Sequence, residues 1–250
     1  MIIEIDAGNS RLKWRALSEA DEPALNGAPE SLIAETLREI ADSLNDGGNS
    51  VCRPSEIRLA SVRSPDSLAA LARDCQELFA VAPSIVRVAR EQAGVAIQYT
   101  DPSRLVVDRW LAMLAAKARS SGGCLVVDSG TAMTIDQLSA EGCHEGGYIV
   151  PGLALMRQSL TENTRIRLDP DYALGGAALG HSTDAAVYHG CIAASVAVIR
   201  EAWLALFAQD PQARLYITGG GAGELSAHLQ DCAPCHVPDL VLDGLSLAFG

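Results

Sequence analysis

Apolar residues recur along the chain with two different spacings, and these spacings predict an alternation of strands and helices. Residues 2–16 alternate between apolar and polar side chains around a turn at Gly8-Asn9, which predicts a hairpin of antiparallel strands. Apolar residues three and four positions apart predict helices at residues 32–44, 64–79, 153–163 and 184–208. Shorter apolar runs predict strands at residues 57–62, 84–89, 131–138, 148–150 and 214–218, with a turn at residues 142–147. This order indicates an α/β fold with mixed sheets.

One pattern occurs twice, because two apolar strands each end in Asp-x-Gly followed by a polar residue. The copies are Asp6-Ala7-Gly8-Asn9 and Asp128-Ser129-Gly130-Thr131, almost half the chain apart. A repeat at this distance predicts two similar halves. We expect their boundary near residues 118–123, which gives an N-terminal half at residues 1–119 and a C-terminal half at residues 120–250.

Composition narrows the class of protein. Of 250 residues, 48% are hydrophobic and 20% are charged, which excludes disorder and a collagen-like repeat. The formal net charge of −12 argues against a nucleic-acid partner, since polyanions are bound by cationic surfaces. We find no signal peptide and no apolar run of about 18 residues. We therefore expect a soluble, cytoplasmic protein without a membrane partner.

Seven cysteines make an odd count without a disulfide framework, so reduced thiols are expected. Cys232 and Cys235 have a spacing also found in zinc and redox sites. A structural zinc site needs four ligands, and no second such pair exists. His228 and His236 lie close by in sequence, so a zinc site remains an alternative to two ordinary thiols.

The two Asp-x-Gly turns have the composition of phosphate-binding loops. Glycine at a strand end lets a phosphate approach the backbone N–H groups without a Cβ in the way. The carboxylates could hold a cation beside the phosphates. Side-chain donors for phosphate oxygens are available at Asn9, Ser10, Lys13 and Thr131. The alternative is an Asx-type turn whose Asp bonds only its own backbone. Because the pattern occurs twice, we favour phosphate binding.

Two glycine-rich segments share part of the spacing of known nucleotide-binding motifs. Residues 219–223 follow a predicted strand and could let a nucleobase or ribose lie against bare backbone, but Glu224 stands where a dinucleotide fingerprint needs its third glycine. Residues 175–182 have P-loop spacing, but His181 replaces the lysine and no apolar strand precedes them. The sequence therefore excludes a Walker-type ATPase.

Residues 99–110 combine several chemical groups. Asp101 and Pro102 predict the start of a helix that places Asp108 and Arg109 about two turns in. The Asp108 carboxylate could accept a proton from an alcohol while the Arg109 guanidinium pairs with an anionic group of the same molecule. The alternative is two surface charges on an amphipathic helix.

Six motifs, in this order over almost the whole chain, resemble the type III pantothenate kinases. They are Asp6-x-Gly8-Asn9-Ser10, Tyr99-x-x-Pro102-x-x-Leu105-x-x-Asp108-Arg109-Trp110, Asp128-x-Gly130-Thr131-Ala132, Gly146-Gly147-x-Ile149-x-Pro151-Gly152, Ser182-Thr183 and Thr218-Gly219-Gly220. The resemblance implies two duplicated actin-like (ribonuclease-H-like) α/β domains with mixed sheets, as in the Hsp70-like and sugar-kinase-like superfamily, with nucleotide in the cleft between them. It also implies a homodimer.

The resemblance further implies transfer of the ATP γ-phosphoryl group to pantothenate, giving 4'-phosphopantothenate in the first step of coenzyme A biosynthesis. Mg²⁺ and a monovalent cation, K⁺ or NH₄⁺, are the implied ions. Asp108 is then the expected general base and Asp128 the expected ligand of the monovalent cation. ATP contacts are expected at Asp6, Ala7, Gly8, Asn9, Ser10, Arg11, Leu12, Lys13, Thr131, Gly219 and Gly220. Pantothenate contacts are expected at Tyr99, Val106, Val107, Asp108, Arg109 and Thr183, although the family usually has glycine at the position of Val106.

Three other functions fit part of the pattern. Another sugar-kinase-like phosphotransferase, or a polyphosphate enzyme, would share the Asp-x-Gly turns, but the segment from Tyr99 to Arg109 argues against it. A regulatory relative of the Bvg accessory factor type, linked to virulence genes, would act indirectly, because the acidic chain is unsuited to DNA. A non-catalytic nucleotide-binding relative is the third, and Val106 is the one sequence feature in its favour.

Overall fold

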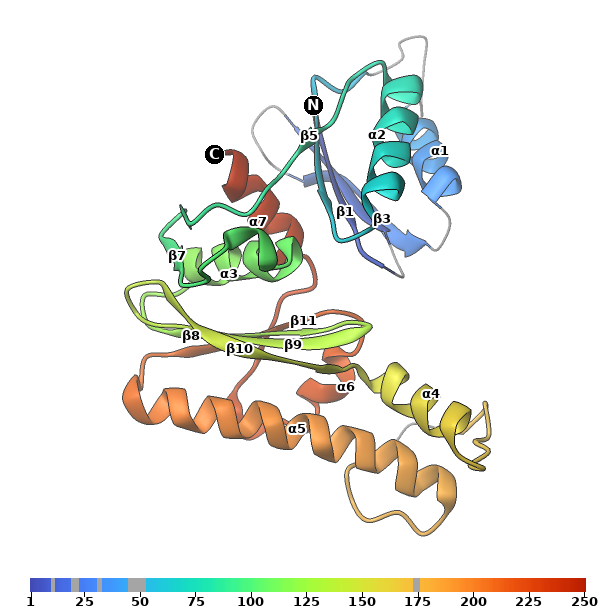
Figure 1. The fold of residues 1–250 in the computed structure, drawn as a ribbon, viewed down its shortest axis with the longest axis vertical. Coiled ribbons are helices and arrows are strands. Elements are labelled where there is room, and N and C mark those ends of the chain that lie inside the picture. Colours follow the sequence, from blue (N-terminus) through green and yellow to red (C-terminus); the bar gives the residue numbers. More distant parts are fainter. Residues whose placement is uncertain (10–11, 19–22, 31–32, 45–52, 173–175) are drawn as a thin grey trace. The chain divides into compact units, whose positions relative to one another are not determined.

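The structure is a computed structural model that describes residues 1–9, 12–18, 23–30, 33–44, 53–172 and 176–250 (Figure 1). The chain divides into two compact units. Unit 1 contains residues 1–93, 99–115 and 241–250, and unit 2 contains residues 94–98 and 116–240. The last ten residues therefore belong with the first sheet. The predicted division of the chain into duplicated halves at residues 1–119 and 120–250 stays a prediction.

Unit 1 is built on a five-stranded sheet with the order β3-β2-β1-β4-β5. Its strands are β1 (Ile2–Ala7), β2 (Leu12–Leu17), β3 (Pro23–Glu30), β4 (Glu56–Ser61) and β5 (Ser84–Ile85). The neighbours β1-β2 and β2-β3 are antiparallel, whereas β1-β4 and β4-β5 are parallel. The other elements of this unit are α1 (Ile33–Leu44), α2 (Pro65–Phe79), β6 (Glu91–Gln92), a 3₁₀ turn at Pro102–Arg104, most of α3 (Val107–Ala118) and most of α7 (Leu240–Phe249).

The apolar face of this sheet packs against α1 and α2. Ile3 and Ile5 of β1 are fully buried in one cluster with Leu37 of α1 and Leu71 of α2. Alternate residues of a strand point to opposite faces, so the intervening residue, Glu4, lies on the other face. The two faces of β1 are therefore buried against different partners.

A network of charged side chains fills that second face and binds α7 to the sheet. Glu4 is 0% exposed, and its carboxylate accepts hydrogen bonds from Arg15 Nε at 2.8 Å, Arg58 Nη1 at 3.3 Å and Ser246 Oγ at 2.7 Å. Arg15 also donates to Asp243 Oδ1 at 2.6 Å. Burial lowers the pKa of Arg15, but its bonds to Asp243 and Glu4 outweigh burial and hold the pKa above its usual value. Both ends of the chain therefore stabilise unit 1.

Unit 2 repeats the topology of the first sheet. Its strands follow the order β12-β11-β8-β9-β10-β7, in which β8-β9-β10 are antiparallel and β8-β11 and β11-β12 are parallel. The strands are β7 (Val95–Ile97), β8 (Cys124–Ser129), β9 (Ala132–Leu138), β10 (Cys143–Pro151), β11 (Arg214–Thr218) and β12 (Cys235–His236). The order 10-9-8-11-12 corresponds strand for strand to 3-2-1-4-5. The predicted fold of two similar α/β domains with mixed sheets is thus confirmed.

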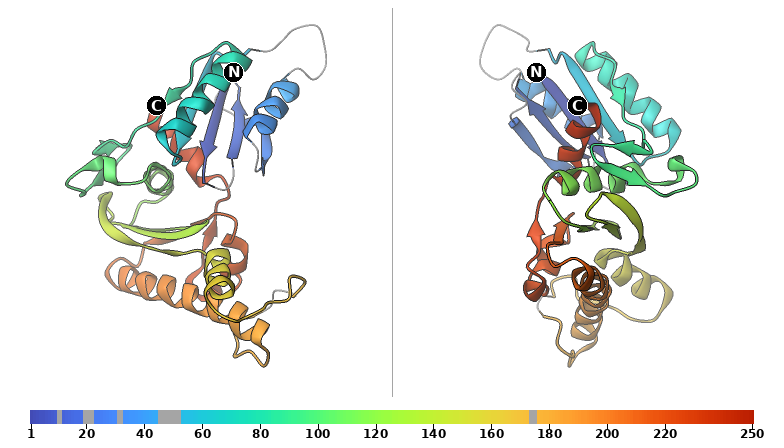
Figure 2. Two further views of the ribbon diagram at one scale, coloured as in Figure 1. Left: turned by 45° about the vertical axis from the view of Figure 1, so that its right-hand side comes forward. Right: turned by 90° about the vertical axis from the view of Figure 1, so that its left-hand side faces the viewer.

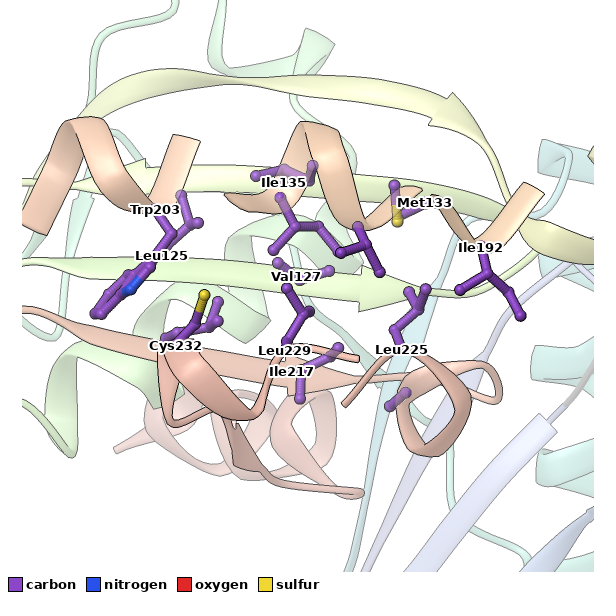
Figure 3. Close-up of a cluster of buried hydrophobic side chains, with 14 of the residues drawn as sticks. Leu125, Val127, Met133, Ile135, Ile192, Trp203, Ile217, Leu225, Leu229 and Cys232 are labelled. Carbon is purple, nitrogen blue, oxygen red and sulfur yellow. The ribbon is translucent and has the colours of Figure 1, made fainter. Parts of the chain in front are cut away.

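The long helix α5 (Thr183–Gln209) covers one face of the second sheet, running beneath it in Figure 1 and seen nearly end-on in the right view of Figure 2. Figure 3 shows Leu125 and Val127 of β8 packed in one buried cluster with Ile192 and Trp203 of α5. The remaining helices of this unit are α4 (Leu153–Asn163), α6 (Ala222–Ser226) and a 3₁₀ turn at Gln230–Cys232. By length and composition alone α5 is apolar enough to cross a membrane, a property that buried core helices share, and one side of α5 packs in the core of unit 2.

Most predicted elements are confirmed, and the differences have local causes. The predicted strand at residues 84–89 is only the two-residue β5. The predicted turn at residues 142–147 lies earlier, at residues 139–142, where Ser139 N–H donates to the Cys143 carbonyl. Gly142 has φ +88° in that turn, whereas Gly146 and Gly147 lie inside β10 at a bulge. The elements β3, β6, β7, β12 and α7 were not predicted.

Replacement of Arg15 by Met tests the buried network. The change would leave the Glu4 carboxylate without its closest cation, so we expect the free energy of unfolding to fall by about 3–5 kcal/mol. The matched control is Arg73→Met on the exposed face of α2, with an expected change within about 0.5 kcal/mol. Chemical denaturation measures both. A loss below about 1 kcal/mol for Arg15→Met would show that the network does not hold α7 in place.

Candidate active site

The first Asp-x-Gly turn lies between β1 and β2, as predicted. In the sheet register, Asp6 is opposite Lys13 of β2 and next to Ala60 of the parallel strand β4. Asn9 is exposed at the turn, and the Gly8 carbonyl accepts a hydrogen bond from Arg63 Nε at 2.8 Å. Asp6 and Lys13 therefore lie at the strand ends beside the turn, with opposite charges in register.

The structure describes only some of the other residues of this turn that were expected to contact ATP. Ala7 and Leu12 are fully buried in the core of unit 1, so they can offer a ligand only backbone groups. Ser10 and Arg11 lie outside the described residues. Arg63 was not predicted to belong here. It follows β4, and the carboxyl ends of parallel neighbours meet at one sheet edge, so the pairing of β4 with β1 is the signal that would have found it.

The second turn follows β8 in unit 2 and packs against the glycines after β11. Asp128 of β8 lies in register with Thr218 of β11, as Asp6 does with Ala60 in unit 1. Gly219 has φ +89°, and a Cβ there would overlap Asp128 Oδ1 and lie 2.7 Å from the Ser129 carbonyl oxygen. The bare Cα of Gly219 is therefore required by close packing on Asp128. The structure thus brings together Asp128 and Gly219, which the sequence analysis assigned separately to the cation and to ATP.

A third loop, at the end of β10, closes around the same turn. Gly152 N–H donates to the Thr131 carbonyl at 2.9 Å, and a Cβ at Gly152 would overlap the Gly130 carbonyl oxygen. Gly221 N–H donates to the Ser129 carbonyl at 2.9 Å. Gly221 belongs to the segment 219–223 that the sequence analysis placed near a nucleobase or ribose, whereas Gly152 was only part of a motif and had no role assigned. The loops that follow β10 and β11 thus fix the conformation of residues 128–131.

Thr131 and Thr183 are both exposed in unit 2 and can meet a ligand. Thr131 lies at the tip of the turn between β8 and β9. Thr183 is the first residue of α5, directly after Ser182, whose hydroxyl accepts the Ala185 N–H at 3.1 Å as the helix cap. Gly220 lies between the two glycines that pack on Asp128 and Ser129.

The helix that carries Asp108 begins later than predicted. Asp101 caps only the 3₁₀ turn at Pro102–Arg104, since Leu105 is extended with φ −80° and ψ 125° and buries its side chain. A new helix, α3, starts at Val107. Asp108 therefore lies in the first turn of α3 rather than two turns in, and the positive end of the helix dipole stabilises its negative charge.

Tyr99 and Arg109 are brought together in unit 1. Arg109 is 4% exposed, and its Nη1 donates to the Tyr99 hydroxyl at 3.3 Å. The half-buried Asp108 accepts the Arg109 backbone N–H at 2.7 Å. Three of the residues expected to contact pantothenate thus form one hydrogen-bonded group, and the burial of Arg109 shows that this residue is not a solvated surface charge.

Val106 and Val107 complete this segment. The Val106 side chain is 41% exposed, and its carbonyl accepts the Trp110 N–H at 3.3 Å. Val106 is not among the residues with positive φ, so this backbone does not require the glycine that the family usually has there. The half-buried Val107 is the first residue of α3.

The cysteines do not form a metal site within the described part of the chain. There, no three His, Cys, Asp or Glu side chains are grouped to hold a metal ion. Cys232 is buried in the core of unit 2, while Cys235 is exposed on β12. Burial raises the pKa of the Cys232 thiol. Cys52 lies outside the described residues.

Comparisons with known proteins agree with these features. A sequence model of the family described as Type III pantothenate kinase matches residues 2–205. Relatives named type III pantothenate kinase include one from Pseudomonas putida, 38% identical over 265 residues, and one from Azotobacter vinelandii, 36% identical over 260 residues. Both alignments cover 99% of this chain and 98% of the relative.

Three solved structures are similar in fold. A protein assigned to the Baf family of transcriptional activators, from Campylobacter jejuni, aligns over 99% of this chain and 96% of its own with a TM-score of 0.59 and 19% identity. A protein assigned as a 2-dehydro-3-deoxygalactonokinase, from Sinorhizobium meliloti, aligns over 99% and 98% with a TM-score of 0.59 and 15% identity. The activator of 2-hydroxyisocaproyl-CoA dehydratase from Clostridium difficile, with bound ADPNP, aligns over 99% and 92% with a TM-score of 0.51 and 8% identity.

The solved structures are related to this chain in fold alone, so the assignment to a family comes from the sequence matches. The family model covers most of the chain, and relatives more than one-third identical align over almost their full length. The chain therefore belongs to the type III pantothenate kinase family.

Proposed function

We propose that this protein transfers the γ-phosphoryl group of ATP to the terminal hydroxyl of pantothenate, the first step towards coenzyme A. Membership of the family is the observation that carries the proposal. The Asp108-Arg109 pair supports it, because both residues lie in the first turn of α3 and the Arg109 guanidinium donates a hydrogen bond to the Tyr99 hydroxyl. A kinase uses ATP. Pantothenate as the acceptor, Mg²⁺ and a monovalent cation as the bound ions, and the roles of individual residues are proposed in addition.

In the proposed reaction, Asp108 acts as the general base. Phosphoryl transfer needs a carboxylate that accepts the proton of the incoming hydroxyl, together with precise positioning of the two substrates. The first turn of α3 suits this role because the helix N-terminus stabilises the anionic form. Arg109 and Tyr99 would orient the acceptor, and Thr183 would add a further contact.

The two Asp-x-Gly turns are the phosphate-binding elements of the proposal. Their equivalent places in two sheets of the same topology support the same role for each turn, since each exposes polar groups beyond a strand end. Asp6 to Lys13 and Thr131 would contact the phosphates, and Gly219 and Gly220 the nucleoside. A homodimer, a cytoplasmic location and the absence of nucleic-acid and membrane partners also belong to this proposal.

The residues around Asp128 fit a monovalent cation. The Asp128 carboxylate and the Ser129 carbonyl both closely approach the bare Cα of Gly219, so two oxygens of the kind that bind cations are grouped there. Carboxylate and carbonyl oxygens are hard ligands suited to K⁺, and the same chemistry lets Asp6 lie beside Mg²⁺. When bound, these ions offset negative charge on the phosphates.

The direct test is product analysis. Purified protein is incubated with ATP, Mg²⁺ and pantothenate, in either K⁺ or Na⁺, and phosphopantothenate is measured by mass spectrometry. We expect product in K⁺ and little in Na⁺. Absence of product in either salt, with phosphorylation of a sugar offered in place of pantothenate, would assign the chain to another acceptor.

Replacement of Asp108 by Asn tests the base. We expect kcat to fall by about 100-fold or more, because the amide cannot accept the hydroxyl proton, while the binding of ATP and pantothenate is retained. Asp66→Asn is the matched control, since Asp66 occupies the first turn of α2 in the same unit and is exposed. Steady-state kinetics with both substrates measure the effect. Wild-type turnover in Asp108→Asn would exclude Asp108 as the base.

Replacement of Asp128 by Asn tests the cation site. Loss of the carboxylate charge should raise the K⁺ concentration for half-maximal activity by about tenfold or more. Glu201→Gln, an exposed acid on α5 of the same unit, should leave that concentration unchanged. A K⁺ titration of activity measures both variants. An unchanged titration curve for Asp128→Asn would place the cation elsewhere.

A further inference from the structure

A hollow of about 490 Å³ lies beside the segment that precedes α3, and it is lined by Tyr99, Thr100, Asp101 and Arg104. This volume falls in the range of about 300–1,000 Å³ that small-molecule sites occupy. All four lining residues belong to unit 1. The hollow therefore adjoins Tyr99, a predicted pantothenate contact, and includes three residues to which the sequence assigned no part in substrate binding.

Hydrogen bonds from side chains fix the backbone of the segment that lines this hollow. Arg90 donates to the carbonyl of Tyr99 at 3.3 Å and to that of Thr100 at 3.1 Å. Asp101 Oδ1 accepts the N–H of Ser103 at 3.0 Å and its hydroxyl at 2.7 Å. These bonds from Ser103 lower the pKa of the Asp101 carboxyl below its usual value. Arg90 and Asp101 are thus engaged in shaping the loop.

Arg104 is the lining residue that can offer a cation to a ligand. It is exposed, and within the described part of unit 1 its guanidinium makes no hydrogen bond or ion pair. Arg109, by contrast, is buried and donates to the Tyr99 hydroxyl. From the sequence, Arg109 was expected to pair with the anionic group of the substrate. In the structure, the guanidinium that a ligand in this hollow can reach is that of Arg104.

We infer that Arg104 binds the carboxylate of the acid substrate and thereby sets the preference for an acid over a neutral analogue. The inference rests on the proposed function. Pantothenate has a carboxylate at one end and an amide and hydroxyl groups along its length. In this hollow the Arg104 guanidinium can pair with the carboxylate, and the Asp101 carboxylate can accept hydrogen bonds from the hydroxyl or amide donors. A guanidinium fork binds a carboxylate through paired hydrogen bonds, which gives orientation as well as affinity.

The test compares pantothenate with pantothenol, in which a hydroxymethyl group replaces the carboxylate. For Arg104→Gln we expect the KM for pantothenate to rise about tenfold or more, while kcat changes less than about threefold. The KM for pantothenol should stay within about twofold of wild type, because the lost charge has no partner there. Arg104→Lys should recover part of the preference for the acid.

Arg73→Gln is the matched control, since Arg73 is exposed on α2 of the same unit and should alter neither KM. An unchanged KM for pantothenate in Arg104→Gln, or an equal rise for both substrates, would overturn the inference and leave the proposed function intact. Failure of the wild-type protein to phosphorylate pantothenate would overturn the proposed function and, with it, this inference.

Discussion

The Glu4 carboxylate is buried between the first sheet and the last helix, where an unpaired charge would be strongly destabilising. It is satisfied by Arg15 from β2, Arg58 from β4 and Ser246 from α7. Those bonds cross three neighbouring strands and reach the end of the chain, so they fix the register of the sheet and the place of α7 together. Asp6 follows Glu4 by two residues on the same face of β1, and its position at the strand end depends on that register.

The second sheet reaches the same arrangement with different chemistry. Its strands follow the same order and directions, and Asp128 of β8 is the counterpart of Asp6. The counterpart of Glu4, two residues earlier, is Val126, which is buried. Across the hairpin, Val126 lies opposite Asp136, which bonds His144 Nε2 at 2.8 Å, where Glu4 lies opposite Arg15. The repeat therefore preserves the carboxylate at the strand end and not the polar network behind it.

The sequence predicted the features that depend on local patterns and missed those that depend on packing. The hairpins, the long helices and the two carboxylate turns follow from periodicity and turn residues. The predicted start of α3 was wrong. Asp101-Pro102 is a strong helix signal, but it begins only a 3₁₀ turn, which ends where Leu105 becomes extended and buries its side chain. Helix α7 contains Gly244, which disfavours a helix in isolation, but a Cβ there would overlap the Leu111 carbonyl oxygen of α3. Gly152 and Arg63 contact the turns because strand pairing places them there, where they donate hydrogen bonds to the carbonyls of Thr131 and Gly8.

In the proposed function, Asp108 accepts the proton of the hydroxyl that is phosphorylated, and each Asp-x-Gly turn has a role in binding phosphate. A crystal structure of the protein with pantothenate and a non-hydrolysable ATP analogue would locate both substrates. We expect phosphate oxygens at the turns that follow Asp6 and Asp128, and the terminal hydroxyl of pantothenate within hydrogen-bonding distance, about 3 Å, of the Asp108 carboxylate. A triphosphate bound away from both turns, or a pantothenate hydroxyl directed away from Asp108, would contradict these roles.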